Sequence, residues 1–197
     1  MFIEVCRSTD ASRAELREGS AGSAAYLDER TARDERTAWR VAAEVTDPEL
    51  PMLTLADLGV LRSVEVDEAG RVEVAITPTY SGCPAMATMR DDLVHRLTEE
   101  GYAEVDVRVQ LEPAWTTDWI SEHGRAALRE AGISAPGPAP RREGPVPLTL
   151  GPVRRAVTCP QCGSADVEVT SEFGSTACKA LYRCRACLEP FDHLKEI

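Results

Sequence analysis

Two pairs of closely spaced cysteines limit most strongly what this chain can fold into. Cys159 and Cys162 form one Cys-x2-Cys pair, Cys184 and Cys187 form another, and 21 residues separate the inner cysteines. This spacing is close to the pattern of a zinc ribbon. Four thiolates make a closed tetrahedral site, which zinc prefers in a structural role. The pattern predicts one structural zinc per chain, although the same ligands would also hold a redox-active iron of the rubredoxin type.

Cys178 lies between the two pairs and outside this ligand set. A strand over Val167 and Val169 and a return strand over residues 180–183 predict a hairpin between the pairs. Six residues of strand would place Cys178 about 20 Å from Cys184, at the hairpin end away from the metal. We interpret Cys178, beside the turn at residues 173–176, as an accessory thiol or part of a docking surface.

The prolines divide the chain into segments. Residues 134–152 hold six of the thirteen prolines, which predicts a semi-extended linker. Residues 1–35 carry few large apolar side chains, so we expect a mobile N-terminal extension. A domain over residues 36–133 and a ribbon over residues 153–197 remain, and a ribbon of this size needs its metal to fold.

The segment over residues 36–133 shows the alternating periods of an α+β domain. Its apolar pattern predicts the order helix, strand, strand, helix, strand, with helices packed on one face of a small sheet. The expected elements are a helix from Asp34, strands near residues 60–67 and 71–77, a helix after Cys83, and a strand over residues 105–111.

Cys83 lies where the second strand of this domain passes into the second helix. Pro84 suits a first helical position, and Gly101 provides a stop. A helix N-terminus favours a thiolate, so this placement predicts a thiol more acidic than the ~8.5 of a free cysteine. The alternative is a small buried residue beside a tight turn.

Trp115 and Trp119 are two of the three tryptophans. Their spacing would place both on one helix face. We expect them to cover the edge of the sheet; an exposed pair would instead make a protein-docking anchor.

The formal charge of −11 is concentrated in residues 1–140. An acidic body is a poor match for nucleic acid or an anionic membrane, so neither is an expected partner. There is no apolar run of transmembrane length and no secretory core, which predicts a cytoplasmic protein. Seven cysteines in a reducing compartment indicate metal or thiol chemistry rather than disulfides.

Three motifs resemble the SufT-like iron–sulfur assembly domain family over residues 37–112. The motifs are Asp47-Pro48-Glu49-Leu50-Pro51, Asp57-Leu58-Gly59-Val60 and Ser81-Gly82-Cys83-Pro84. The resemblance implies that Cys83 is the residue that handles iron or an iron–sulfur cluster. Asp47, from the first motif, is an accessory candidate.

A second resemblance extends to the tail of the chain. Three segments resemble the D-subunit family of phenylacetyl-CoA epoxidases, namely residues 114–119, 173–182 and 189–191. In the aerobic phenylacetate pathway, a multicomponent di-iron monooxygenase epoxidises the aromatic ring of phenylacetyl-CoA. The D subunit is not its catalytic core, and the assembly-like domain suggests a role in maturing the metal centres.

The leading hypothesis is therefore an accessory or maturation factor in which Cys83 transiently holds iron or an iron–sulfur cluster. The partners would be the oxygenase or reductase subunits. One cysteine cannot hold a cluster alone, so a second chain, most simply in a homodimer, or external thiols must complete the shell. The alternatives are a zinc-ribbon scaffold without metal transfer, a nucleic-acid module, and thiol catalysis by Cys83. Catalysis is the poorer alternative, because it needs a base and His95 lies about three helical turns, or roughly 18 Å, along the helix from Cys83.

Overall fold

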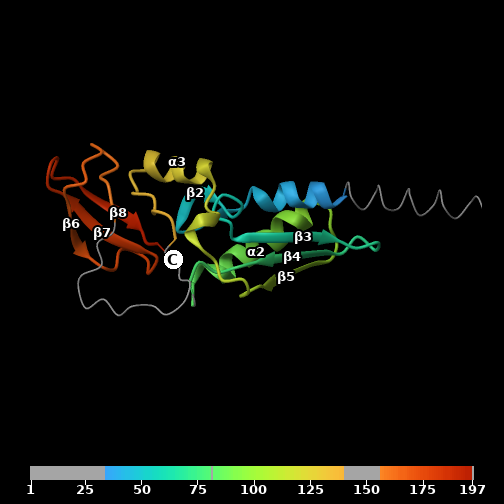
Figure 1. Cartoon of the computed structure of the whole chain (residues 1–197). Helices are drawn as coiled ribbons and strands as arrows, with labels where there is room; N and C mark the ends of the chain where they lie inside the picture. Colours follow the sequence, from blue (N-terminus) through green and yellow to red (C-terminus); the bar gives the residue numbers. More distant parts are fainter. Residues whose placement is uncertain (1–33, 81, 140–155, 197) are drawn as a thin grey trace, which may run out of the picture.

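The structure is a computed structural model that describes residues 34–80, 82–139 and 156–196. The mobile extension expected over residues 1–35 lies outside these ranges, except for residues 34 and 35, which are helical. The α+β sheet and the C-terminal ribbon lie at opposite ends of the molecule, with a β-hairpin and a short helix between them (Figure 1).

A three-stranded sheet forms the centre of the first domain, and its strand order is β3-β4-β5. Strand β3 (Leu61–Val66) is antiparallel to β4 (Val72–Ile76), and β4 is parallel to β5 (Val105–Val109). The helix α2 (Ala85–Glu100) makes the crossover between the two parallel strands. The predicted α+β class and its helix and strand order are confirmed.

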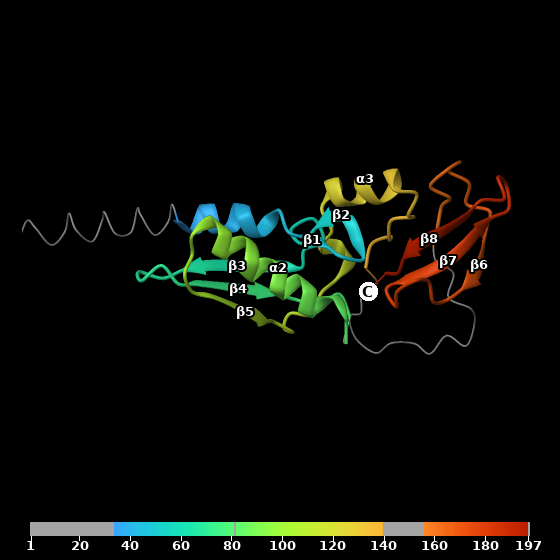
Figure 2. The same cartoon turned by 180° about the vertical axis from the view of Figure 1, so that it is seen from behind.

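Alternating side chains explain why the sheet and its helices stack. Val72, Val74 and Ile76 are fully buried on one face of β4, as period-two alternation requires, and Ala75 is also buried on the opposite face. Helix α2 buries Met89, Leu93 and Leu97. Figure 2 shows α2 and the helix of residues 34–43 beside each other, and Arg40 of that helix forms an ion pair with Glu100 of α2.

A hairpin that the sequence analysis missed lies between the first helix and β3. Strands β1 (Thr46–Asp47) and β2 (Leu50–Thr54) pair antiparallel. The buried Asp47 carboxylate accepts hydrogen bonds from the backbone N–H groups of Glu49 and Leu50, at 2.7 and 3.0 Å. Such an Asx turn satisfies backbone donors that would otherwise be left unpaired in the turn. Asp47 therefore shapes this turn.

The two tryptophans do not share a helix face, so that prediction is wrong. Thr116 caps a single 3-10 turn, η1 (Thr117–Trp119), and the backbone is already extended again at Ile120. Trp115 precedes this turn, is 5% exposed, and donates its Nε1–H to the Leu58 carbonyl oxygen at 2.8 Å. A short turn between two extended segments cannot align side chains four residues apart.

A short helix, α3 (Glu122–Glu130), packs against β2 of the hairpin. Its N-cap Ser121 accepts a hydrogen bond from the Gly124 N–H, and Gly132, with φ of 76°, follows its end. Within the residues that the structure describes, no helix is long and apolar enough to cross a membrane.

In the part of the chain that the structure describes, the ribbon contains three strands in the order β6-β7-β8, one more than the predicted hairpin. These are β6 (Val167–Ser171), β7 (Lys179–Cys184) and β8 (Pro190–Leu194), all antiparallel to their neighbours. The ribbon's own core consists of six buried residues: Val157, Cys159, Ala180, Tyr182, Cys184 and Phe191.

The ribbon packs directly on the first domain, and the first residues of the predicted semi-extended linker take part in the contact. Ser134 bridges to β8 through hydrogen bonds with Asp192 and Leu194. Cys178 and Leu194 belong to the first domain's buried core. Residues 134–139 therefore lie against both units instead of spacing them apart, and the rest of the predicted linker, residues 140–152, lies outside the described residues.

Candidate metal centre and thiol pocket

The four ribbon cysteines converge on one point, as the sequence predicts. The Sγ atoms of Cys159 and Cys187 lie 3.7 Å apart and those of Cys162 and Cys184 lie 3.6 Å apart. All four sulfurs lie within 4.8 Å of one another. Zinc–sulfur bonds of about 2.3 Å to a tetrahedral centre separate the sulfurs by about 3.8 Å. The cluster therefore has the dimensions of a tetrathiolate metal site.

Backbone groups of the second knuckle prepare Cys184 to bind as a thiolate. The N–H of Cys187 points at the Cys184 sulfur at 3.5 Å. Hydrogen bonds from the backbone of Cys187, and secondarily of Ala186, lower the pKa of the Cys184 thiol to about 7 although burial opposes this. Because the thiolate is the form that coordinates a metal, this backbone supports Cys184 as a ligand. At Cys187, the backbone hydrogen bond from Glu189 is outweighed by burial and by hydrogen bonds among the sulfurs, which raise the pKa of its thiol to about 12 in the absence of a metal.

Cys83 lies on the turn between β4 and α2, where the sequence places it. Pro84 is the N-cap of α2, and the backbone of Gly82 has a φ of 86°, which a glycine adopts without strain. The backbone N–H of Ala85 donates to the Cys83 sulfur. The Cys83 side chain is half-buried and packs against the first domain's core.

The predicted acidity of Cys83 is wrong, because burial outweighs the helix terminus. Burial raises the pKa of the Cys83 thiol, and the nearby Glu49, Asp47 and Cys178 raise it further, while the hydrogen bond from Ala85 opposes them. A helix end is worth about 0.3–1 kcal/mol, whereas full desolvation can shift a pKa by several units. The sequence shows the helix terminus but not the enclosure around it.

This raised pKa predicts how Cys83 reacts with alkylating agents. Since the thiolate is the nucleophile, the rate of carbamidomethylation at Cys83 should reach its midpoint above the ~8.5 of a free cysteine. Peptide mass spectrometry of zinc-loaded protein across a pH series measures this rate at each cysteine. The urea-denatured chain is the control and should return to the ordinary value. If the Cys83 alkylation rate in the folded protein reached its midpoint at a lower pH than in the denatured chain, the helix N-terminus would outweigh burial after all.

Cys83 lines a small enclosed pocket between the two domains. The pocket has a volume of about 10 Å³, close to the smallest space that holds one water molecule. It brings together Cys83, Cys178 and Asp47, three of the residues that the sequence analysis singled out. The lining residues are Asp47, Glu49, Leu50, Leu58, Thr79, Cys83, Trp115, Cys178, Leu194 and Lys195.

Of the two tryptophans singled out from the sequence, one lines this pocket and the other lies apart from it. Trp115 is buried in the pocket lining, so the packing interpretation holds for it and it presents no docking surface. Trp119 is half-buried beneath the Arg62 guanidinium, whose carbon lies 3.8 Å from the ring centroid. Gly59, with φ of 69°, lies against it, and a Cβ at this glycine would approach the Trp119 Cβ to 2.6 Å.

None of the three histidines, all of which the structure describes, lines the Cys83 pocket. His95 is exposed on α2 and pairs with Glu99. His123 Nδ1 contacts the Asp57 carboxylate at 3.1 Å, and His193 is buried 3.4 Å from Glu196. Thiol catalysis by Cys83 therefore has no histidine base in this structure.

The loop at Asp57 is held by a hydrogen-bond network apart from the pocket's thiols. Ser121 donates its Oγ–H to the Asp57 carboxylate at 2.6 Å, and Thr54 donates to it at 2.9 Å. Burial disfavours the carboxylate, but the hydrogen bonds from Ser121, His123 and Thr54 prevail and lower the pKa of Asp57. The network holds the loop next to Leu58, which lines the pocket, so the Asp57 motif has a positioning role.

Comparisons with known proteins match both domains of the chain. Residues 36–113 match a family described as iron-sulfur cluster assembly protein, and residues 143–195 match the PaaD zinc beta ribbon domain. A protein of Escherichia coli (strain K12), provisionally named as the D subunit of 1,2-phenylacetyl-CoA epoxidase, is 45% identical over 157 residues, which are 80% of this chain and 90% of the relative. The chain belongs to the D-subunit family of phenylacetyl-CoA epoxidases.

Two further matches cover the first domain of this D-subunit family member. The Fe-S protein maturation auxiliary factor SufT of Staphylococcus aureus (strain USA300) is 33% identical over 43% of this chain and 96% of the relative. A crystal structure of the domain of unknown function DUF59 from Bacillus anthracis is 25% identical, with a TM-score of 0.49 over 51% of this chain and 96% of that chain.

Two charged residues of the Cys83 pocket escaped the sequence analysis. Glu49 comes from the β1–β2 turn and Lys195 from the end of the ribbon, 146 positions apart in the sequence. Glu49 belongs to the quoted Asp47–Pro51 motif, so that motif was the available signal. Nothing near Lys195 in the sequence indicates its place, because only the packing of the ribbon on the first domain brings it there.

Proposed function

We propose that this D-subunit family member is an accessory, maturation-type factor for the multicomponent di-iron phenylacetyl-CoA monooxygenase. In this role Cys83 transiently holds iron or an iron–sulfur cluster as cargo. The observation that supports the proposal best is the position of Cys83 in a domain of the iron–sulfur assembly family, where it lines a pocket together with Asp47 and Glu49. Thiolate and carboxylate groups together are suitable ligands for ferrous iron.

The ribbon has a structural part in this proposal. A zinc ion held by Cys159, Cys162, Cys184 and Cys187 fits the observed sulfur spacing, and it would stabilise the ribbon without being transferred. Docking to the oxygenase or reductase subunits is assigned to the β6–β7 turn, next to the contact with the first domain, where the Phe173 side chain remains exposed. Phe173 at this turn is 70% exposed, with the Lys195 Nζ 4.6 Å from the centre of its ring. An exposed aromatic ring beside a cation is a suitable anchor for a protein partner.

A scaffold role without metal transfer is the second candidate, and one observation favours it. The pocket at Cys83 is too small for an iron–sulfur cluster at about 10 Å³, so a cluster could enter only if the ribbon moved away. A scaffold would need the ribbon and the domain interface but would not need the thiol of Cys83.

Iron loading of the isolated protein distinguishes these roles. Reduced, zinc-loaded, full-length protein is incubated anaerobically with ferrous ion, with or without sulfide, and desalted before iron, sulfide and zinc are measured. The native chain should retain iron in addition to one zinc per chain, and Cys83→Ser should retain the zinc alone. Equal iron in both proteins, or none in either, would favour the scaffold. The matched control is Cys6→Ser, which makes the same chemical change at a cysteine outside the ribbon ligand set.

A further inference from the structure

We infer that Cys178 of the ribbon and Cys83 of the first domain form one two-thiol site for a single thiophilic divalent metal ion. Both residues line the same pocket, although they lie 95 positions apart in the sequence. The inference rests on the proposed function, because it names the second protein ligand for the ion that Cys83 handles. In this site the chain itself supplies the second thiol, and no second copy of the chain is needed for it.

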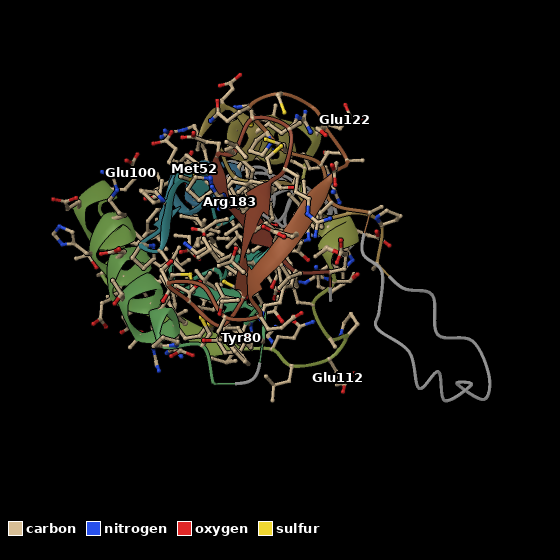
Figure 3. All side chains as sticks on the ribbon, turned by 90° about the vertical axis from the view of Figure 1, so that its left-hand side faces the viewer. Met52, Tyr80, Glu100, Glu112, Glu122 and Arg183 are labelled. Atoms are coloured by element: carbon tan, nitrogen blue, oxygen red, sulfur yellow. The ribbon has the colours of Figure 1, made fainter. Side chains whose placement is uncertain are left out.

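The surroundings of Cys178 hold its side chain at the pocket and not in solvent. Cys178 directly precedes β7 and is 8% exposed. The Thr176 Oγ1 lies 3.0 Å from its sulfur, and the Lys195 N–H donates to its carbonyl oxygen at 2.9 Å. Figure 3 views the molecule from the ribbon end and shows the ribbon strand labelled at Arg183 in front of the first domain, with Tyr80 at the lower edge. A spare surface thiol would have none of this packing.

The charges around the pocket favour a cation between the two thiols. Asp47 and Glu49 line it together with the two cysteines, and Lys195 is the one basic residue in the described lining. Burial raises the pKa of both thiols, and the carboxylates raise it further. Burial also raises the pKa of Tyr80, with additional contributions from Cys83, Glu49 and Cys178. A divalent ion would relieve this mutual repulsion among acidic groups.

The size of the pocket selects a single ion over a cluster. A volume of about 10 Å³ accommodates one small occupant. Two sulfurs and two carboxylate oxygens complete a four-coordinate shell for ferrous iron, cobalt or zinc. Among the described residues, no three ligand atoms at this pocket lie within 4.8 Å of one another as they do in the ribbon. Binding therefore draws the side chains together, and both thiols release their protons to solvent as they become thiolates.

The site exists only while the ribbon is docked on the first domain. Leu194 joins the first domain's core from β8, and Ser134 ties the same strand to the segment after α3. Separation of the two units would leave Cys83 with a single protein thiol. Undocking of the ribbon, for example by a partner protein, would thus lower the affinity of the site for the ion and favour its release.

Cobalt(II) titration tests the two-thiol site directly. Reduced, full-length protein with zinc in the ribbon is titrated anaerobically with cobalt(II) and followed by thiolate-to-cobalt charge-transfer absorption in the near ultraviolet. The native chain should bind one cobalt in addition to its zinc. Cys178→Ser should weaken cobalt binding by about tenfold or more and remove about half of the absorption per bound cobalt. Cys6→Ser, with the same chemical change elsewhere, should behave like the native chain.

Mixing two variants determines whether both thiols come from one chain. Cys83→Ser and Cys178→Ser proteins are combined in equal amounts and titrated again. The mixture should remain as defective as its components. Recovery of native cobalt affinity would mean that the ligands come from two chains, which overturns the site within one chain. The zinc content of each variant, expected at one per chain, shows that the ribbon is intact.

The cobalt affinities of the two serine variants distinguish a wrong two-thiol site from a wrong role for Cys83. Native cobalt affinity in Cys178→Ser together with lost affinity in Cys83→Ser would overturn the two-thiol site and leave the role of Cys83 standing. Unchanged cobalt affinity in both variants would overturn both proposals. A Cys83–Cys178 disulfide in non-reducing peptide maps, combined with no additional cobalt bound by the reduced protein, would replace the metal site with a redox pair.

Discussion

Cells that make the monooxygenase subunits together with the Cys83→Ser protein are expected to yield epoxidase that lacks iron and activity. Serine is nearly isosteric with cysteine, and the turn depends on Gly82, with its φ of 86°, and on Pro84 at the N-cap of α2. The fold should therefore survive. A hydroxyl is a far poorer ligand for iron than a thiolate, so the variant should fail to load or transfer the metal. Epoxidase turnover and iron content after co-expression measure the effect.

Two comparisons separate maturation from other roles. Adding the Cys83→Ser protein to epoxidase that is already active should hardly change its turnover, because a maturation factor acts before catalysis. Cys6→Ser should support full activity in co-expression. Full iron content and activity of the epoxidase made with Cys83→Ser would contradict the carrier hypothesis and favour the scaffold role. Normal iron with lost activity would instead indicate a structural or electron-transfer role for this cysteine.

The parts that the sequence predicted correctly depend on contacts that are local or periodic. The ribbon ligands follow from two Cys-x2-Cys pairs whose spacing suits one tetrahedral site. The sheet and α2 follow from alternation on β4 and from the helical period after Cys83. The third ribbon strand, β8, was missed because Pro190 and His193 interrupt its apolar pattern, although it pairs with β7 over five residues.

The parts that could not be predicted depend on how the two units meet. Cys83 and Cys178 share a pocket only because Leu194 and Cys178 pack into the first domain's core. That packing also encloses Cys83, which reverses the shift in thiol pKa expected from its helix terminus. Likewise, the proline-rich composition of residues 134–152 indicates an extended backbone but not that Ser134 would pair with β8. No pattern within one segment contains this information.

Loss of one zinc ligand is expected to affect far more than the ribbon. Cys162→Ser should release the zinc, because three thiolates and a hydroxyl no longer make the closed site. Metal binding supplies about 10–16 kcal/mol in small structural zinc sites, while the ribbon's own core has only six buried residues. The ribbon should therefore unfold and withdraw Leu194 and Cys178 from the first domain. Burial of one leucine side chain is worth about 1.5–3 kcal/mol, so the first domain should also melt at a lower temperature.

Zinc content measures the loss of the metal, limited proteolysis measures the unfolding of the ribbon, and thermal melting measures the destabilisation of the first domain. Cys178→Ser is the matched control, since it changes a ribbon cysteine outside the four-sulfur cluster. The control should keep one zinc per chain and a protease-resistant tail. In Cys162→Ser, protease should cut within residues 156–196, and Cys83 should alkylate at a lower pH than in the native chain because its enclosure is gone.

If Cys178→Ser empties the zinc site as thoroughly as Cys162→Ser, the ligand assignment is wrong. If Cys162→Ser loses zinc but Cys83 stays as protected as before, the ribbon does not enclose the pocket and the two-thiol site cannot depend on its docking.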